Sequence, residues 1–145
     1  MLSRLLAATV AGGVVFFILG FIVYGLILDP MVMRPNTNPD ALKLMKDPPV
    51  WIPLILANLV SAFLLAYIFE KWASIRTFAT GASAGATIMF LISLSFQLMF
   101  YAFMKMTDSF TPMIADILGS VILGAIGGGV IGLVLGMMNK NTAAA

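Results

Sequence analysis

The chain has 145 residues, of which 61% are hydrophobic and 10% are charged. A water-soluble domain carries about 25% charged residues, so this composition predicts a membrane protein. The sequence has no cysteine and no histidine, which excludes disulfides, thiolate nucleophiles, imidazole bases and histidine-ligated zinc or haem. The net charge of +2 is too small, and the Lys and Arg residues are too scattered along the chain, to indicate nucleic-acid binding.

Four apolar stretches are long enough to cross a bilayer, which takes roughly 20 residues of helix. They are residues 5–28, 51–69, 79–103 and 112–138, which leaves a loop at 29–50 and a tail at 139–145. An open strand in lipid would leave its backbone groups unpaired. The fold class we expect is therefore an all-α membrane protein, with a four-transmembrane-helix bundle as its single domain.

The first stretch follows Arg4, an arrangement that it shares with secretory signal peptides. Its apolar run is too long for such a peptide, and the sequence LDPMVMRP after it is not a small-residue cleavage site. We therefore expect a retained helix. In the loop that follows, NPDALKLMK predicts one short helix, with Asn38 as its N-cap and Pro39 at its first position. This helix would lie on the lipid headgroups, or it would form a lid or docking surface.

The remaining stretches carry recognisable boundaries. Trp51 and Tyr67 bracket the second stretch as interfacial aromatic residues do, and Pro53 falls in its first turn, where a missing N–H costs little. Thr111 is a candidate N-cap for the fourth stretch.

Glycines occur in rows near one end of three stretches. These are Gly12 and Gly13, then Gly81 and Gly85, then Gly124, Gly128, Gly132 and Gly136. Helices in lipid associate through close packing, and small residues let their backbones approach. We expect the glycines to seat the first and third helices against the fourth. Because the third and fourth helices are antiparallel, Gly81 and Gly85 should come level with Gly132 and Gly136.

Polar side chains gather in the half of the bilayer nearer the 29–50 loop, which we expect to be the outer half. They are Tyr24, Asn58, Gln97, Tyr101 and Asp116. We expect Asn58 and Gln97 to be buried between helices, with each other as the simplest partners, at roughly 1 kcal/mol per hydrogen bond. The group would hold the helices together through interhelical hydrogen bonds, or it would line a shallow polar cavity.

Asp116 is the single ionisable residue within the predicted spans. Such residues are functional candidates, but this one lies near a helix start and would also serve as an interfacial anchor. The eleven methionines are scattered along the chain, which favours adaptable packing over a soft-metal pathway. We expect no catalytic residues, no metal site and no cofactor.

Orientation depends on how Lys and Arg are distributed. An even number of spans places both termini on one side, and four of the eight Lys and Arg residues fall on each side. Acidic residues dilute the basic charge of the 29–50 side. We therefore expect a multi-pass protein of the bacterial inner membrane with both termini in the cytoplasm, and insertion in both orientations remains an alternative.

Three segments carry a resemblance to a known group of proteins. FFILGFIVYG, LILANLVSAFLLAYIFEKWASIRTF and GASAGATIMFLISL resemble small four-span inner-membrane proteins of unknown function from Bacteroidota. The resemblance covers nearly the whole chain and implies a four-helix membrane protein. Small multidrug exporters fit poorly, because the first span here has no acidic residue. Dual-topology fluoride channels also fit poorly, because AGGVVFF lacks their arginine.

Three functions are compatible with the sequence. The first is a non-enzymatic assembly or accessory subunit of a membrane complex, or a homo-oligomer, held through glycine-rich helix packing. The alternative is a small channel or transporter with a polar outer-leaflet cavity, lined by Tyr24, Asn58, Gln97 and Asp116. The third is a lipid-binding, quinone-binding or membrane-enzyme role that uses Tyr24, Tyr101 and Asp116 as proton donors. The partners expected are membrane lipids and either further copies of the chain or other membrane subunits.

Overall fold

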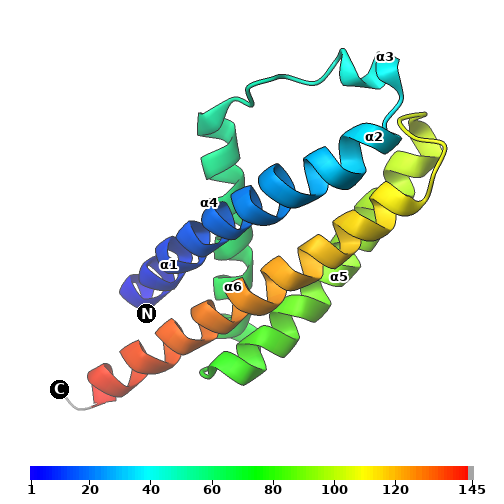
Figure 1. Cartoon of the computed structure of the whole chain (residues 1–145). Coiled ribbons are helices and arrows are strands. Elements are labelled where there is room, and N and C mark those ends of the chain that lie inside the picture. Colours follow the sequence, from blue (N-terminus) through cyan, green and yellow to red (C-terminus); the bar gives the residue numbers. More distant parts are fainter. Residues whose placement is uncertain (144–145) are drawn as a thin grey trace.

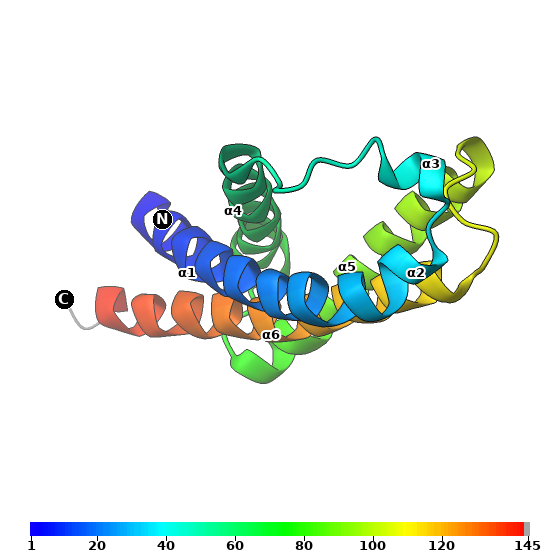
Figure 2. The same ribbon diagram turned by 45° about the horizontal axis from the view of Figure 1, so that its top comes forward.

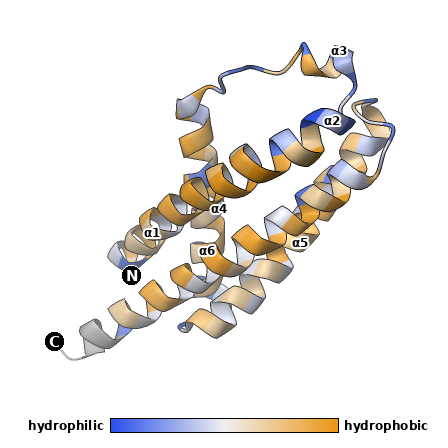
Figure 3. Cartoon of the chain, in the orientation of Figure 1, coloured by the Kyte–Doolittle hydropathy of each residue, from blue (hydrophilic) through white to orange (hydrophobic). Residues whose placement is uncertain are grey.

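The computed structural model describes the backbone of residues 1–143 and the side chains of residues 1–139. Every regular element in this part of the chain is a helix (Figure 1). Four helical stretches are long and apolar enough to cross a membrane, namely Leu2–Asn36, Trp51–Ala73, Phe78–Phe103 and Thr111–Asn139. Figure 3 shows apolar residues along most of their length and hydrophilic residues near α2 and α3. The chain is thus a multi-pass, all-α four-helix bundle, as its composition predicts.

The first membrane helix is longer than its predicted range of 5–28. It begins as α1 (Leu2–Gly20) and continues as η1 (Phe21–Met33) and α2 (Arg34–Asn36). The segment η1 is a π-helix that contains Pro30. Proline normally breaks a helix because its ring blocks the carbonyl four residues back, but a π-helix bonds to the carbonyl five residues back. The helix therefore runs on through the apolar residues after Pro30 and takes up the first part of the predicted 29–50 loop.

The short helix α3 (Pro39–Leu42) has the predicted cap and is shorter than predicted. Asn38 Oδ1 accepts a hydrogen bond from the Asp40 N–H at 3.0 Å. The next N–H groups, of Leu44 and Met45, bond to carbonyls only three residues back, and the sequence then reaches DPP, which cannot continue a helix. The prediction that all of NPDALKLMK is helical is therefore wrong beyond Leu42.

The second and third membrane helices follow their predicted ranges closely. The second is α4 (Trp51–Ile68), continued by η2 (Phe69–Ala73), and the third is α5 (Phe78–Phe103). Between them Ser74 adopts a left-handed conformation, with φ of 50°, and the Ile75 N–H bonds to the Phe69 carbonyl at 3.1 Å. These features make a tight turn that reverses the chain.

The fourth membrane helix, α6 (Thr111–Ala143), begins one residue earlier than its predicted cap implies. Thr111 is the first helical residue and not the N-cap. Its N–H donates to Ser109 Oγ at 3.2 Å, so Ser109 satisfies one of the N–H groups that a helix start leaves free.

The buried core lies between α1, α4 and α6. Its members are apolar side chains of these helices and of η2: Leu5, Ala8, Phe16, Ala62, Leu65, Ala66, Phe69, Leu123, Ile131 and Leu135. Helix α5 contributes none of them and instead packs along α6 (Figures 1 and 2). The start of α1 and the last described turns of α6 lie at one end of the bundle, which we call the terminal end; α2, α3 and the 104–110 loop lie at the other, the loop end.

Helices α5 and α6 meet backbone to backbone through glycines. A methyl group built on Gly128 would lie 2.5 Å from the Gly81 carbonyl oxygen and 2.9 Å from Gly85 Cα. Gly85 likewise faces the Gly124 carbonyl. None of the described glycines has a positive φ, so these positions require glycine for its lack of a side chain and not for its backbone freedom.

The predicted register of these glycines, with Gly81 and Gly85 level with Gly132 and Gly136, is wrong by more than one helical turn. Gly81 lies between Gly128 and Gly132, and Gly85 lies between Gly124 and Gly128. A side chain on Gly136 would instead meet the backbone of Arg76, in the turn before α5. The turn before α5 therefore lies opposite Gly136, at the terminal end of the contact between α5 and α6. This displaces the start of α5 towards the loop end.

The glycines of α1 serve two neighbouring helices. A methyl group on Gly12 would lie 2.6 Å from the Ile131 side chain of α6, and one on Gly13 would lie 2.6 Å from the Leu59 side chain of α4. These contacts are with side chains rather than backbone. They let α1 lie in the angle between α4 and α6.

Candidate functional site

A cavity of about 240 Å³ lies at the loop end, between the end of the first membrane helix, the last turns of α5 and the start of α6. We call it the loop-end cavity. Ten residues line it: Met33, Thr37, Gln97, Phe100, Tyr101, Met104, Met106, Thr107, Pro112 and Met113. The Asn38 N–H donates to the Met106 carbonyl at 2.7 Å, which ties the two loops together at this end of the bundle.

Two polar groups of the cavity remain free to bind a ligand. The hydroxyl of Thr37 donates to the Met33 carbonyl at 2.7 Å, and that of Thr107 exchanges hydrogen bonds with the backbone of Ser109. Within the described part of the chain, neither the Gln97 amide nor the Tyr101 hydroxyl has a hydrogen-bond partner. A half-buried amide without a partner loses hydration, so a ligand bonded to Gln97 would be stabilised.

A network of hydrogen bonds connects three membrane helices below the cavity. Ser93 Oγ of α5 donates to Asp116 Oδ2 of α6 at 2.8 Å. The Tyr24 hydroxyl of η1 lies 2.9 Å from Ser120 Oγ and 3.0 Å from the Asp116 carbonyl oxygen, which accepts from it. A methyl group on Gly119 would lie only 3.1 Å from that hydroxyl, so glycine there lets the tyrosine ring approach α6. Asp116 is therefore a half-buried member of an interhelical network.

The cavity and the network lie one helical turn apart on both helices. Gln97 lines the cavity and follows Ser93 by four residues, whereas Pro112 and Met113 line it and precede Asp116 by four and three. Residues three or four apart share a helix face. The Asp116 side chain accepts from Ser93 through Oδ2 and is paired with no cation among the described residues. The cavity thus has an intramembrane carboxylate just beyond its floor.

We expect the bond between Tyr24 and Ser120 to contribute to stability. Tyr24→Phe and Ser120→Ala should each lower the free energy of unfolding in detergent by about 0.5–1.5 kcal/mol, because interhelical hydrogen bonds in membranes have contributions of this size. The double variant should lose less than the sum of the two. Denaturant titration of all four proteins measures this, and strictly additive losses would show that the two hydroxyls do not interact.

Asn58 does not join this group, and its predicted pairing with Gln97 is wrong. Its amide donates to the Leu54 carbonyl of its own helix at 2.7 Å. Helix α4 packs on α1 rather than on α5, so the two amides have no shared interface. Of the five predicted polar residues, Gln97 and Tyr101 line the cavity and Tyr24 and Asp116 form the network below it. The ring of Tyr101 also stacks on Phe110, with centroids 5.0 Å apart.

A second polar cluster lies at the terminal end. The Glu70 carboxylate, only 4% exposed, pairs with Arg4 at 3.4 Å and with Arg76. Arg4 also donates to Asn139 Oδ1. The four residues come from α1, η2, the turn before α5, and α6, so the carboxylate joins α1 to that turn through the two arginines, and Arg4 extends the group to α6. We call these residues the Glu70 clasp.

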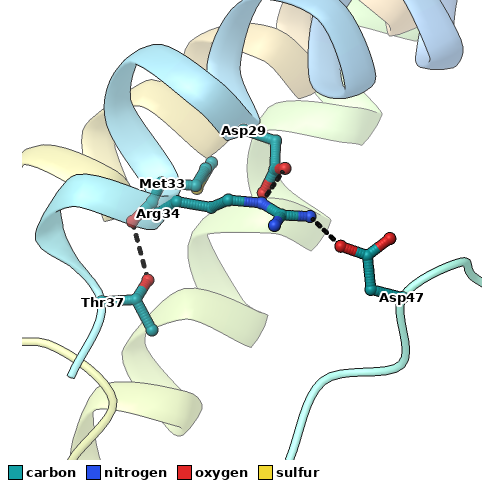
Figure 4. Close-up of polar contacts among 5 residues, drawn as sticks. All are labelled: Asp29, Met33, Arg34, Thr37 and Asp47. Carbon is teal, nitrogen blue, oxygen red and sulfur yellow. Dashed lines mark hydrogen bonds and ion pairs between the residues drawn. The ribbon is translucent and has the colours of Figure 1, made fainter. Parts of the chain in front are cut away.

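A smaller ion-pair group lies at the loop end (Figure 4). Arg34 Nε lies 2.6 Å from Asp29 Oδ2, and Arg34 Nη2 lies 3.1 Å from Asp47 Oδ2. The arginine side chain is about half exposed, so these pairs contribute little to stability. Their effect is to hold the 43–50 segment near the end of the first membrane helix.

Sequence reasoning missed the Glu70 clasp and the grouping of methionines at the cavity. The clasp left one signal, since Glu70 is the first charge after an apolar run and Arg4 and Arg76 also flank apolar runs. The methionines left a partial signal, since Met104, Met106 and Met113 are close in sequence. Met33 joins them only because η1 packs beside the ends of α5 and α6.

Comparison of the chain with protein-family models, with curated protein sequences and with solved structures finds no match to any of the three. The features that point to a function are consequently those of the chain itself: a loop-end cavity with a free amide, and an intramembrane carboxylate one turn below it.

Proposed function

We propose that the chain is a small non-enzymatic transporter of the bacterial inner membrane, with the loop-end cavity as its binding site. The observation that carries this proposal is the free Gln97 amide in a cavity that lies one turn above Asp116. The loop end would face outward and both termini would lie in the cytoplasm. The conformation described here would then be the outward-open one.

The half of the bundle nearer the terminal end is packed too tightly for a solute to pass, and this supports the assignment. Between Asp116 and the terminal end, the glycine backbones of α5 and α6 leave no room even for a methyl group. Beyond them the Glu70 clasp joins all four segments. A solute that entered from the loop end would stop near Asp116 until α5 and α6 separated, which is the behaviour that alternating access requires.

The glycine rows offer little support for the other main hypothesis, an accessory subunit or homo-oligomer. Every glycine of α5 and α6 is buried within the single chain, so these rows present no surface to a partner. One observation does favour that role: residues 51–57 of α4 are all exposed, and they stand away from the α5–α6 pair in both views (Figures 1 and 2). A stable partner seen by native mass spectrometry after mild solubilisation would favour it.

Access to the cavity can be tested without knowing the substrate. The chain has no cysteine, so Gln97→Cys introduces a single thiol. We expect a small charged thiosulfonate reagent to modify it from the loop side and, more slowly, from the terminal side as the protein changes conformation. Intact cells and inverted vesicles provide the two sides, and Asn36→Cys, at the end of α2, reports which side carries the loop end.

A control for this experiment is Ile131→Cys, since the Ile131 side chain is fully buried in the core. It should remain unmodified from both sides. Modification of Gln97→Cys from the loop side alone would leave a binding site and remove the transport role. No modification from either side, while Asn36→Cys reacts, would contradict the proposed function as a whole.

A further inference from the structure

Methionine sulfur is the most abundant free donor at the loop-end cavity. Four of the ten lining residues are methionines, although the whole chain has only eleven. They come from the end of η1, the loop after α5 and the first turn of α6. Long and flexible side chains allow methionine to adapt its position, so four thioethers around one cavity can converge on a small ligand.

The lack of charged lining residues restricts what the cavity can bind. None of its ten lining residues carries a charge. Anions are recognised mainly by Arg and Lys, and calcium or magnesium requires several oxygen ligands, carboxylates above all. Among the described residues, no three acidic side chains come together to bind a metal. Thioethers, by contrast, select soft cations such as Cu(I).

The carboxylate below the cavity fits a single positive charge. Asp116 lies one turn below Pro112 and Met113, and in the described part of the chain no Lys or Arg side chain pairs with it. A charge in a membrane interior is costly unless an opposite charge compensates it. One carboxylate compensates a monovalent cation, whereas a divalent cation would keep an excess charge.

We propose that the loop-end cavity binds a soft monovalent cation, Cu(I) or Ag(I), through the sulfur atoms of Met33, Met104, Met106 and Met113. This inference rests on the proposed function in taking the cavity as the binding site, and it names the class of substrate. It also reverses the expectation that the methionines serve packing alone, because the scattered sequence positions meet at one place in the fold.

The experiment uses silver nitrate as the probe, in chloride-free buffer with the full chain in detergent. Methionine methyl groups labelled with carbon-13 give one NMR signal per residue. With one equivalent of silver we expect the signals of the four cavity methionines to shift and those of the other seven to stay in place. Sodium and zinc salts at the same concentration should shift none.

Matched variants test the ligands. One variant replaces all four cavity methionines with leucine, a swap of similar volume that cores tolerate. The control replaces four exposed methionines, Met31, Met45, Met99 and Met137, with leucine. Losing an outer-shell partner lowers metal affinity by about 10–100-fold, and losing the ligands should lower it at least as much. We expect the first variant to lose silver binding in calorimetry and the control to keep it.

The outcomes separate this inference from the proposed function. Equal silver affinity in the two leucine variants, or equal shifts of all eleven methyl signals, would overturn the metal site even if Gln97→Cys is accessible. Silver binding through the four cavity methionines, with Gln97→Cys inaccessible, would keep the site and remove the transport role. If the fourfold variant does not fold, Met33→Leu and Met113→Leu should each weaken silver binding about tenfold or more, and unchanged affinity in both would overturn the inference.

Discussion

Gly128→Leu is expected to separate α5 from α6 and to destabilise the whole bundle. Even the first carbon of a side chain at this position would lie 2.5 Å from the Gly81 carbonyl oxygen and 2.9 Å from Gly85 Cα. Both contacts are with backbone, which cannot rotate away as a side chain can. Overpacking typically costs about 1–3 kcal/mol. We expect Gly128→Ala to fall in that range and Gly128→Leu to exceed it in the free energy of unfolding measured in detergent.

The matched control for this change is Gly20→Ala. A methyl group there would make only ordinary contacts, 3.8 Å from the Leu123 side chain and 4.0 Å from Asn58 Oδ1. Because alanine favours helix over glycine by about 1 kcal/mol, the control should be as stable as the parent protein or slightly more stable. If Gly128→Leu melted at the same temperature as the control, the close contact of α5 with α6 would be disproved.

The second large effect is expected from Glu70→Gln. The change keeps the shape of the side chain but removes the only negative charge of the Glu70 clasp, so Arg4 and Arg76 would face each other unneutralised. Removing one partner of a buried ion pair typically costs about 3–5 kcal/mol. The two arginine side chains keep 18% and 27% of their exposure to solvent, so we expect a loss near the lower limit, about 3 kcal/mol.

An exposed ion pair provides the control for Glu70→Gln. Asp40 pairs with Lys43 at 2.8 Å, and both side chains are at least 75% exposed. Exposed pairs contribute about 0–1 kcal/mol, so Asp40→Asn should change the free energy of unfolding very little. Comparable small losses in the two variants would mean that the Glu70 clasp does not hold the four segments together.

Several features of the fold follow from local sequence alone. Apolar runs near 20 residues predict four membrane helices because the bilayer requires that length. Asn38 before Pro39 predicts a cap because an amide oxygen at that position can accept a helix N–H. Glycine rows predict close helix packing because lipid gives helices no hydrophobic reason to associate. Each of these inferences depends on residues within one segment and on the solvent that surrounds it.

Local sequence also misled at two places. Pro30 ends a helix in most contexts, yet here the bonding of η1 changes and the helix continues to Asn36. Asn58 and Gln97 appear at similar depths in adjacent stretches, but α4 turns its packed face to α1, and the two amides never meet. Depth along a helix is a property of the sequence, whereas the choice of neighbour depends on the packing of all four helices.

The sequence by itself determined the class of this protein, the number of its membrane helices and the residues able to bring them close together. Only the tertiary structure decided which side chains share a site. Met33 meets Met104, Met106 and Met113 at the loop-end cavity, and Arg4 meets Glu70 in the Glu70 clasp, only because the helices that carry them pack side by side. The physical reason is that hydropathy and helix length act along one segment, whereas register and crossing angle arise from contacts between segments.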